Sequence, residues 1–307
     1  MSRPLPKVIY LTFGFLCLSF LHVSYAAVFQ LPAAGNSVIG QITKVYAEPG
    51  DTLSDIGERY DVGFMELVEA NPHLEQEATL TPWTAITVPA RYILPDAPRR
   101  GIVINLAELR MYYYPPGKNI VETIPVGIGR EGWETPVGST QITHKIKDPT
   151  WYPPKSVRKD ALEHGIELPL AFPPGPENPL GRYALKLGWK GYLIHSTNEP
   201  EGVGRRSSAG CIRMFPHDAE RFYEKIPVGT PVHVVNQAFK AGWQDGKLLL
   251  EAHIPLQEQQ RDDGSDFAPV VETITEAIGQ QVIQVDWKKV KQVVEQQAGI
   301  PQVIATP

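Results

Sequence analysis

The chain has 307 residues, of which 42% are hydrophobic and 21% charged, and its formal net charge is −5. This length suffices for one medium domain and a smaller module, with a core that needs no metal or disulfide. The acidic balance, without a long basic run, excludes the electrostatic footprint of a nucleic-acid-binding protein, so we expect no nucleic-acid partner.

Residues 1–26 predict a cleavable export signal. Arg3 and Lys7 precede an apolar run over residues 8–21, and small residues stand at Ser24 and Ala26, where signal peptidase reads them. The alternative is a retained membrane anchor, but the run is shorter than the roughly 20 residues of a spanning helix. We therefore expect an exported protein with no stable membrane span after cleavage.

The sequence contains two cysteines, Cys17 and Cys211. Cleavage after Ala26 removes Cys17, so the mature chain cannot form an internal disulfide, although export leads to an oxidising compartment. An unpaired cysteine in such a protein is either a small buried hydrophobic residue or a reactive thiol. The neighbours of Cys211 must decide between these interpretations.

Residues 42–90 predict a small α+β domain with the order strand, helix, helix, strand. Asp51 or Thr52 can cap the first helix, and Asn71-Pro72 separates the two helices. This pattern resembles a LysM domain, a module that binds the N-acetylglucosamine-containing glycan of peptidoglycan. The alternative is a small cap that packs on a catalytic domain.

After a proline-containing linker, residues 100–236 predict a mostly β domain with one or two helices. Runs of β-branched and aromatic residues predict its strands, at 102–106, 108–114, 120–126, 139–143, 192–195 and 232–235. A helix is expected at 218–226, after Pro216. From about residue 237 to 307 the strand pattern stops, and we predict an extension of open role with one helix over 286–297, capped by Asp286.

The stretch from residue 194 to 214 carries the candidate chemistry. His195 closes an apolar strand, and Cys211 follows sixteen positions later, after a loop and small residues. The loop lets the chain double back so that imidazole and sulfur come within hydrogen-bond reach, as a thiol nucleophile and its base require. An oxygen of Ser196 can orient the imidazole, which draws off the thiol proton, and backbone N–H groups around Gly210 can face a developing oxyanion.

This stretch resembles the active-site signature of the L,D-transpeptidase catalytic domain, also called the YkuD domain. There, a histidine is followed about sixteen residues later by Ser/Thr-His-Gly-Cys. Other segments resemble the family in the same order, at 135–138, 148–154 and 178–181. Ala209 replaces the usual histidine and Ser196 replaces a common glycine, but neither change removes the base or the nucleophile. The resemblance implies a β-sandwich catalytic domain and a cysteine-dependent L,D-transpeptidase.

The resemblance also implies a reaction. Cys211 attacks the diaminopimelate carbonyl of a peptidoglycan tetrapeptide stem, releases D-alanine and forms a thioester that an amine resolves. A second stem as acceptor gives a 3→3 crosslink, an outer-membrane lipoprotein becomes anchored, and water yields a trimmed stem. A LysM-like module before this domain resembles the periplasmic group that contains lipoprotein-anchoring enzymes, so we expect the periplasm and slightly favour anchoring.

Five residues are predicted to contact substrate: Arg213, Ser208, Asn198, Trp151 and Tyr152. Arg213 can pair with a substrate carboxylate, with a structural ion pair as the alternative. Trp151 and Tyr152 suit the wall of a peptide groove, or else the core. The remaining histidines show no ligand-like spacing, so we expect neither a metal nor a cofactor.

Two other classes of function stay open. One is a non-catalytic wall-binding protein in which the LysM-like unit does the work, against which the intact His195 and Cys211 argue. The other is a cysteine peptidase that cleaves ordinary L,L peptide bonds.

Overall fold

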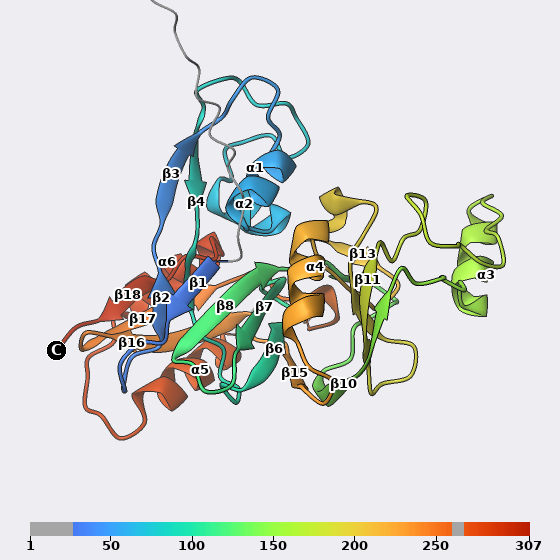
Figure 1. Cartoon of the computed structure of the whole chain (residues 1–307). Coiled ribbons are helices and arrows are strands. Elements are labelled where there is room, and N and C mark those ends of the chain that lie inside the picture. The colour runs from blue at the N-terminus through green and yellow to red at the C-terminus, as the bar shows by residue number, and fades with distance from the viewer. Residues whose placement is uncertain (1–26, 260–266) are drawn as a thin grey trace, which may run out of the picture.

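The computed structural model describes residues 27–259 and 267–307, so the predicted signal segment lies outside the described residues. Within them, a small α+β unit and a C-terminal extension both pack against a large β domain (Figure 1). No helix in these two ranges is long and apolar enough to cross a membrane.

The small unit has the predicted order of strand, helix, helix and strand. Its elements are β3 (Thr43–Tyr46), α1 (Leu53–Tyr60), α2 (Phe64–Ala70) and β4 (Ala85–Val88), with β3 and β4 antiparallel. Thr52 caps α1, because its Oγ1 accepts from the N–H of Asp55 at 3.3 Å. Asp51 instead binds the guanidinium of Arg59 at 2.6 Å. Apolar side chains of both helices form the core of this unit.

The central domain contains one nine-stranded sheet. Its spatial order is β1 (Ala27–Gln30), β8 (Ile120–Pro125), β7 (Arg110–Tyr114), β6 (Gly101–Asn105), β15 (Pro231–Val235), β10 (Gly138–Lys147), β11 (Tyr183–Leu187), β12 (Leu193–His195) and β14 (Ile212–Arg213). All six predicted strands of residues 100–236 are confirmed. Two strands of the sheet within this range were not predicted: β14 has only two residues, and β11, with the sequence Tyr-Ala-Leu-Lys-Leu, contains no β-branched residue.

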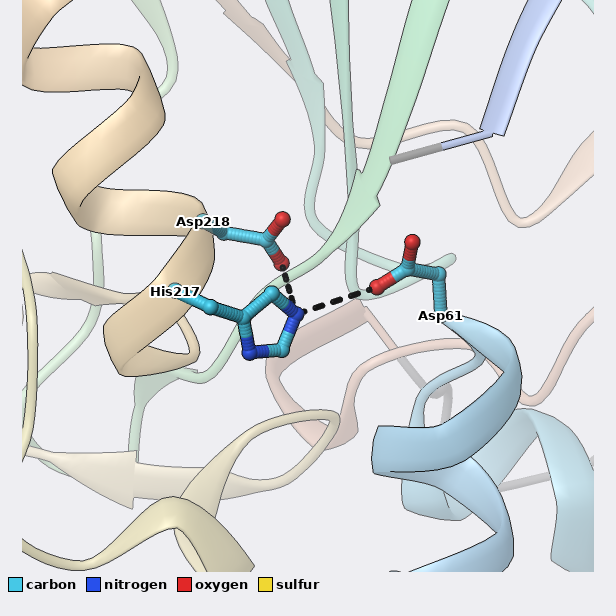
Figure 2. Close-up of side chains that lie close together, drawn as sticks. All are labelled: Asp61, His217 and Asp218. Atoms are coloured by element: carbon cyan, nitrogen blue, oxygen red, sulfur yellow. Dashed lines mark hydrogen bonds and ion pairs between the residues drawn. The ribbon is translucent and has the colours of Figure 1, made fainter. Parts of the chain in front are cut away.

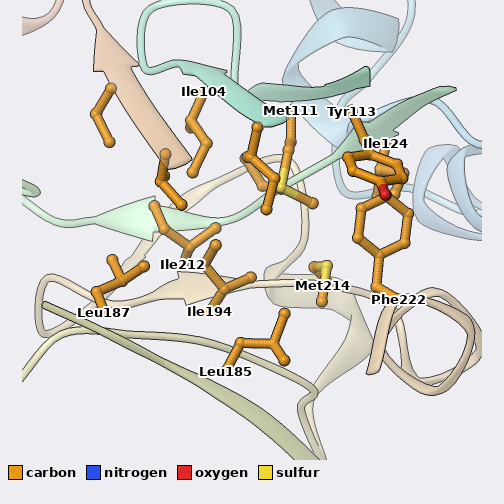
Figure 3. Packing of buried hydrophobic residues seen from close by; sticks show 14 of the residues in the cluster. Ile104, Met111, Tyr113, Ile124, Leu185, Leu187, Ile194, Ile212, Met214 and Phe222 are labelled. Carbon is orange, nitrogen blue, oxygen red and sulfur yellow. The ribbon is translucent and has the colours of Figure 1, made fainter. Parts of the chain in front are cut away.

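The sheet curls so that its two halves enclose one core, which confirms the mostly β, sandwich-like fold. Ile104 and Met111, from β6 and β7, lie in the same cluster as Ile194 and Ile212, from β12 and β14 (Figure 3). Phe222 of α4 (Pro216–Lys225) closes one side of this core, as the helix prediction required. The remaining short elements of the first 259 residues are β2 (Val38–Gly40), β5 (Arg91–Ile93), β9 (Ile128–Gly129), α3 (Lys155–Glu163), η1 (Pro200–Gly202), β13 (Arg206–Ser208) and η2 (Gln257–Gln259).

The C-terminal extension is more regular than predicted. It contains β16 (Phe239–Gln244), β17 (Lys247–Ala252), α5 (Ala268–Ile278), α6 (Trp287–Gln296) and β18 (Gln302–Ala305). The helix capped by Asp286 is confirmed, but the expectation that strands end near residue 236 was wrong. Neither strand contains the β-branched residues that favour a strand. β17 is built on leucines, and β16 contains Gly242.

Buried ionic contacts join the three parts. Lys240 Nζ, from β16, lies 2.8 Å from carboxylate oxygens of both Glu108 and Glu251. His253 pairs with Glu251 at 2.8 Å and with Glu69 of α2 at 3.2 Å. The extension is thereby fastened to both the catalytic sheet and the small unit.

Candidate active site

His195 ends β12 and is held by its own neighbour. Its Nδ1 lies 2.5 Å from the carbonyl oxygen of Ser196, and the side chain is buried. Because a carbonyl oxygen can only accept, Nδ1 carries the proton and the neutral ring presents Nε2 as an acceptor. Burial and the positive charge of Arg213 lower the pKa of His195 to about 4, against the opposing effect of the Ser196 carbonyl. The imidazole is therefore neutral at pH 7.

The register of β12 and β14 relates the position of Cys211 to the face of the sheet that carries His195. The strands run parallel, with Ile194 opposite Ile212 and His195 opposite Arg213. Both isoleucines point into the core, so the alternate residues point to the other face. Continued by one residue, this alternation places Cys211 on the face that carries His195 and Arg213.

The thiol of Cys211 is partly buried. Its Sγ lies 3.6 Å from the carbonyl oxygen of Gly191, which accepts its hydrogen bond in this state. Burial raises the pKa of the Cys211 thiol above its ordinary value, while the backbone of Leu193 and the charge of Arg213 act to lower it. Catalytic hydrogen bonds often form only when substrate closes the site, so this rotamer is compatible with a later approach to His195.

A tight turn positions Cys211. Gly210 adopts a φ of +101°, and a Cβ at this position would lie 3.0 Å from Cε1 of Tyr192. The Gly210 N–H donates to Ser208 Oγ at 3.1 Å, and this hydroxyl in turn donates to the Cys211 carbonyl at 2.6 Å. Thr135 Oγ1 donates to the Gly210 carbonyl at 2.9 Å. The hydroxyl of Ser208 is thus used inside the turn, and the N–H of Gly210 is already engaged.

A second turn supports Ser196. Gly181 has a φ of +60°, and a Cβ there would lie 2.7 Å from the side chain of Ser196. The buried side chain of Asn178 holds this turn, because its Nδ2 donates to the carbonyl of Pro149 and its Oδ1 accepts from the N–H of Leu180. Thr135, Asn178 and Gly181 lie in segments that resemble the family in sequence. Their roles do not follow from the sequence, because their contacts join distant parts of the chain.

Arg213 both forms an ion pair and lines a cavity. Its guanidinium forms an ion pair with Glu199 at 3.3 Å, and its side chain is only 14% exposed. It also lines a cavity of about 660 Å³ between the catalytic domain and the small unit, together with Thr52, Glu77 and Arg205. The structural ion pair considered as the alternative role of Arg213 is therefore present, with Glu199 as the partner. The side chain of Arg213 also lines a cavity that can admit a ligand.

The other predicted contact residues differ in their surroundings. Asn198 is exposed on the loop after β12. Trp151 is half-buried and packs on Phe172, with ring centroids 5.3 Å apart. Tyr152 is 70% exposed, just before α3. None of the described contacts brings these three side chains together with Cys211.

Comparisons with known proteins decide the family. Residues 99–234 match the L,D-transpeptidase catalytic domain, and residues 47–89 match the LysM domain. The chain is 37% identical to "Probable L,D-transpeptidase YcfS" of Escherichia coli (strain K12) over 282 residues, which are 90% of this chain and 88% of that protein. This chain belongs to the L,D-transpeptidase family. The resemblance stated from the sequence is therefore confirmed for both domains.

Other members of the L,D-transpeptidase family are similarly close. "Probable L,D-transpeptidase ErfK/SrfK" of Salmonella typhimurium is 36% identical, over 94% of this chain and 94% of that protein. Among solved structures, "Structure of the Ldtfm-avibactam carbamoyl enzyme" is 24% identical with a TM-score of 0.36, over 46% of this chain and 50% of that chain. That likeness is too partial to add to the family assignment.

Proposed function

We propose that this L,D-transpeptidase uses Cys211 to attack the diaminopimelate carbonyl of a peptidoglycan tetrapeptide stem, releasing D-alanine and transferring the acyl group to an amine. One observation supports this most strongly. The imidazole of His195 is held with Nε2 free to accept a proton, and the register of β12 and β14, extended by one residue, puts Cys211 on the same face of the sheet. The family membership supports the type of reaction.

The pKa directions favour a particular order of proton transfer. Burial raises the pKa of the Cys211 thiol and lowers that of His195, so the free enzyme holds a neutral thiol and a neutral imidazole. In the sequence-based expectation, by contrast, the imidazole draws the proton off the thiol. The thiol proton passes to Nε2 as the sulfur–carbon bond forms, and the imidazolium returns it to the amine of departing D-alanine. The acceptor amine then gives a proton to His195 as it displaces the sulfur from the thioester, and the imidazolium passes this proton to the departing Cys211 thiolate, which restores the neutral thiol and imidazole.

Backbone and hydroxyl groups around the sulfur take separate roles in this proposal. Because the Gly210 N–H binds Ser208 Oγ, the N–H of Cys211 is the better candidate to face the oxyanion. Ser208 is then a positioning residue for the nucleophile turn rather than a substrate contact. The Ser196 carbonyl orients His195 and stabilises the imidazolium when it forms.

Neither Cys211 nor His195 lines the cavity that Arg213 lines, and we propose that this cavity holds a part of the substrate away from the reacting carbonyl. Arg213 offers a cation for a stem-peptide carboxylate, and Thr52 and Ser54 of the LysM domain line the same cavity. We propose that peptidoglycan stem peptide and glycan are both bound by this enzyme in the periplasm, after export by the signal at residues 1–26. Asn198, Trp151 and Tyr152 remain candidates for the walls of the peptide site.

Product analysis tests this proposal and its alternatives. We would incubate residues 27–307 with purified disaccharide-tetrapeptide, with and without a lysine-ended peptide, and identify the products by mass. A crosslinked dimer, a peptide adduct or a trimmed tripeptide identifies the acceptor as a stem, a lipoprotein-like lysine or water. Wall binding with none of these products, equal in Cys211→Ala, would support a non-catalytic binding protein. Cleavage only of L,L bonds in a protein substrate would support a peptidase.

A further inference from the structure

Asp61, His217 and Asp218 meet where the LysM domain packs on the catalytic domain (Figure 2). Asp61 is the C-cap of α1, and the other two residues lie in the first turn of α4. Nε2 of His217 lies 3.5 Å from Asp61 Oδ1 and 3.7 Å from Asp218 Oδ2. One potential ligand atom of each residue lies within 4.8 Å of those of the other two, and neither His195 nor Cys211 belongs to this cluster.

The carboxylates of Asp61 and Asp218 are buried, and one oxygen of each lacks a hydrogen-bond donor. Asp61 is 2% exposed and Asp218 is 0% exposed, yet the Oδ2 atom of each has no hydrogen-bond partner in the structure. Asp218 Oδ2 is the atom that faces the imidazole of His217. A buried carboxylate oxygen without a donor is costly, so this arrangement calls for a positive ligand.

The contact of His217 with Asp61 is a long hydrogen bond, and both His217–carboxylate distances are close to those between ligand atoms around a metal. Separations of 3.5 and 3.7 Å exceed those of ordinary hydrogen bonds between a ring nitrogen and a carboxylate. A tetrahedral zinc ion with ligand bonds of roughly 2.0–2.2 Å holds neighbouring ligand atoms roughly 3.3–3.6 Å apart. The potential ligand atoms of the three residues lie within 4.8 Å of one another, so movements of the carboxylates and of the His217 ring that bring them to these separations would complete three corners of a tetrahedron.

Two arginines contact Asp218 and Asp61 through atoms other than the proposed ligand atoms. Arg221 binds Asp218 through its other oxygen, Oδ1, at 2.5 Å. Arg110 donates to the backbone carbonyl of Asp61 at 3.0 Å and not to its side chain. Such outer contacts are the kind that orient ligands around a metal.

A second cluster of carboxylates and a histidine in the described chain, formed by Glu108, Glu251 and His253, differs from the cluster at Asp61. There, Lys240 Nζ lies 2.8 Å from both Glu108 and Glu251, and His253 lies 2.8 Å from Glu251. Direct contacts of hydrogen-bond length already supply the positive charge in that cluster. In the cluster at Asp61, such a contact reaches Asp218 Oδ1, from Arg221 at 2.5 Å, whereas the Oδ2 atoms of Asp61 and Asp218 have no hydrogen-bond partner among the described residues.

We propose that Asp61, His217 and Asp218 bind a divalent transition-metal ion, with Zn²⁺ as the best match to one imidazole and two carboxylates. His217 is one-third exposed, which leaves a route for the ion and for water as a fourth ligand. Because Asp61 and His217 lie 156 positions apart and belong to different domains, the ion joins the LysM domain to the catalytic domain. This distance in sequence also explains why the sequence analysis expected no metal.

The test uses residues 27–307 carrying Cys211→Ala, so that the thiol cannot compete for metal. After chelator treatment, Zn²⁺ alone is added in competition with a chromophoric chelator, and the melting temperature is measured in parallel. We expect one Zn²⁺ per chain and a higher melting temperature, because the ion binds only the folded domain pair. His217→Gln and Asp218→Asn should each weaken binding by at least roughly 100-fold. His73→Gln, an exposed histidine of the LysM domain, should bind as the parent does.

Co²⁺ supplies a second readout, because four-coordinate Co²⁺ absorbs visible light far more strongly than six-coordinate Co²⁺. We expect the strong absorption in the parent and in His73→Gln, and its loss in His217→Gln. No Zn²⁺ binding at roughly 100 µM free metal, far weaker than a structural site, would overturn the proposal. Equal affinity in His217→Gln and the parent would overturn it as well, and a folded Asp218→Asn variant with parental affinity would do the same.

Discussion

The carbonyl oxygen of Ser196 lies 2.5 Å from Nδ1 of His195, and this contact leaves Nε2 as the only ring nitrogen that can accept a proton. The lowered pKa of about 4 then sets a pH dependence, because only the neutral imidazole can serve as base. We expect D-alanine release to persist well below pH 6.5 and to fall as pH drops through about 4. A pH–rate profile checks this, and an acid limb near the ordinary histidine pKa would contradict it.

Arg213→Gln should raise the pKa of His195 and the pKa of Cys211. The charge of Arg213 lowers the pKa of His195 and also that of Cys211, so its removal raises both. The acid limb of the rate profile should move up toward the ordinary histidine value, and the pH at which iodoacetamide alkylates Cys211 should also rise. Arg182→Gln, whose exposed side chain pairs with Asp148, is the control and should move neither. Unchanged profiles in Arg213→Gln would show that its charge does not reach the site.

Thr135→Val should slow acylation by disturbing the nucleophile turn. Thr135 Oγ1 donates to the Gly210 carbonyl at 2.9 Å and accepts from the Gly129 N–H at 3.1 Å. Loss of both bonds should cost about 1–3 kcal/mol of unfolding free energy and roughly 10- to 100-fold in kcat. Thr135→Ser retains the hydroxyl and should recover most of kcat. If valine and serine variants act alike, the hydroxyl does not position Cys211.

Comparison of Gly210→Ala with Gly117→Ala separates the effect of backbone strain from the effect of a steric clash with Tyr192. At a φ of +101° an alanine is strained, and its Cβ would also meet Tyr192 at 3.0 Å. Gly117→Ala is the matched control, because Gly117 has a φ of +71° with nothing within 4 Å of its Cβ. Both variants should lose about 1–2 kcal/mol of unfolding free energy, but only Gly210→Ala should also lose activity. Equal activity in the two variants would argue against a special role for this turn.

The sequence was sufficient for the parts of the fold that depend on local pattern. Thr52 and Asp286 cap their helices as predicted, and the runs of β-branched residues in the catalytic domain all became strands. The leucine-built β17 shows the limit of this approach, because its pairing and not its composition makes it a strand. His195 and Cys211 stood out through their shared motif. Thr135 and Asn178 act through contacts to distant segments, which spacing along the chain does not reveal.

The buried ion pair of Arg110 and Glu66 should dominate the docking of the LysM domain. Their atoms lie 2.8 Å apart, with 0% and 4% of each side chain exposed, and they come from different domains. Arg110→Met or Glu66→Leu alone should cost about 3–5 kcal/mol, because each leaves an unpaired buried charge. The double variant should cost less than the sum of the two, as measured by urea unfolding. Additive losses would mean that the pair is not coupled.

The central claim is that Cys211 becomes acylated by the stem peptide with His195 as its base. Intact-mass spectrometry of residues 27–307, quenched in acid soon after mixing with disaccharide-tetrapeptide, tests it most directly. We predict a mass gain on Cys211 equal to the substrate minus D-alanine, absent in Cys211→Ala and strongly slowed in His195→Gln. A folded wild-type protein that releases D-alanine with no adduct at Cys211, or equally fast without the sulfur, would contradict the account.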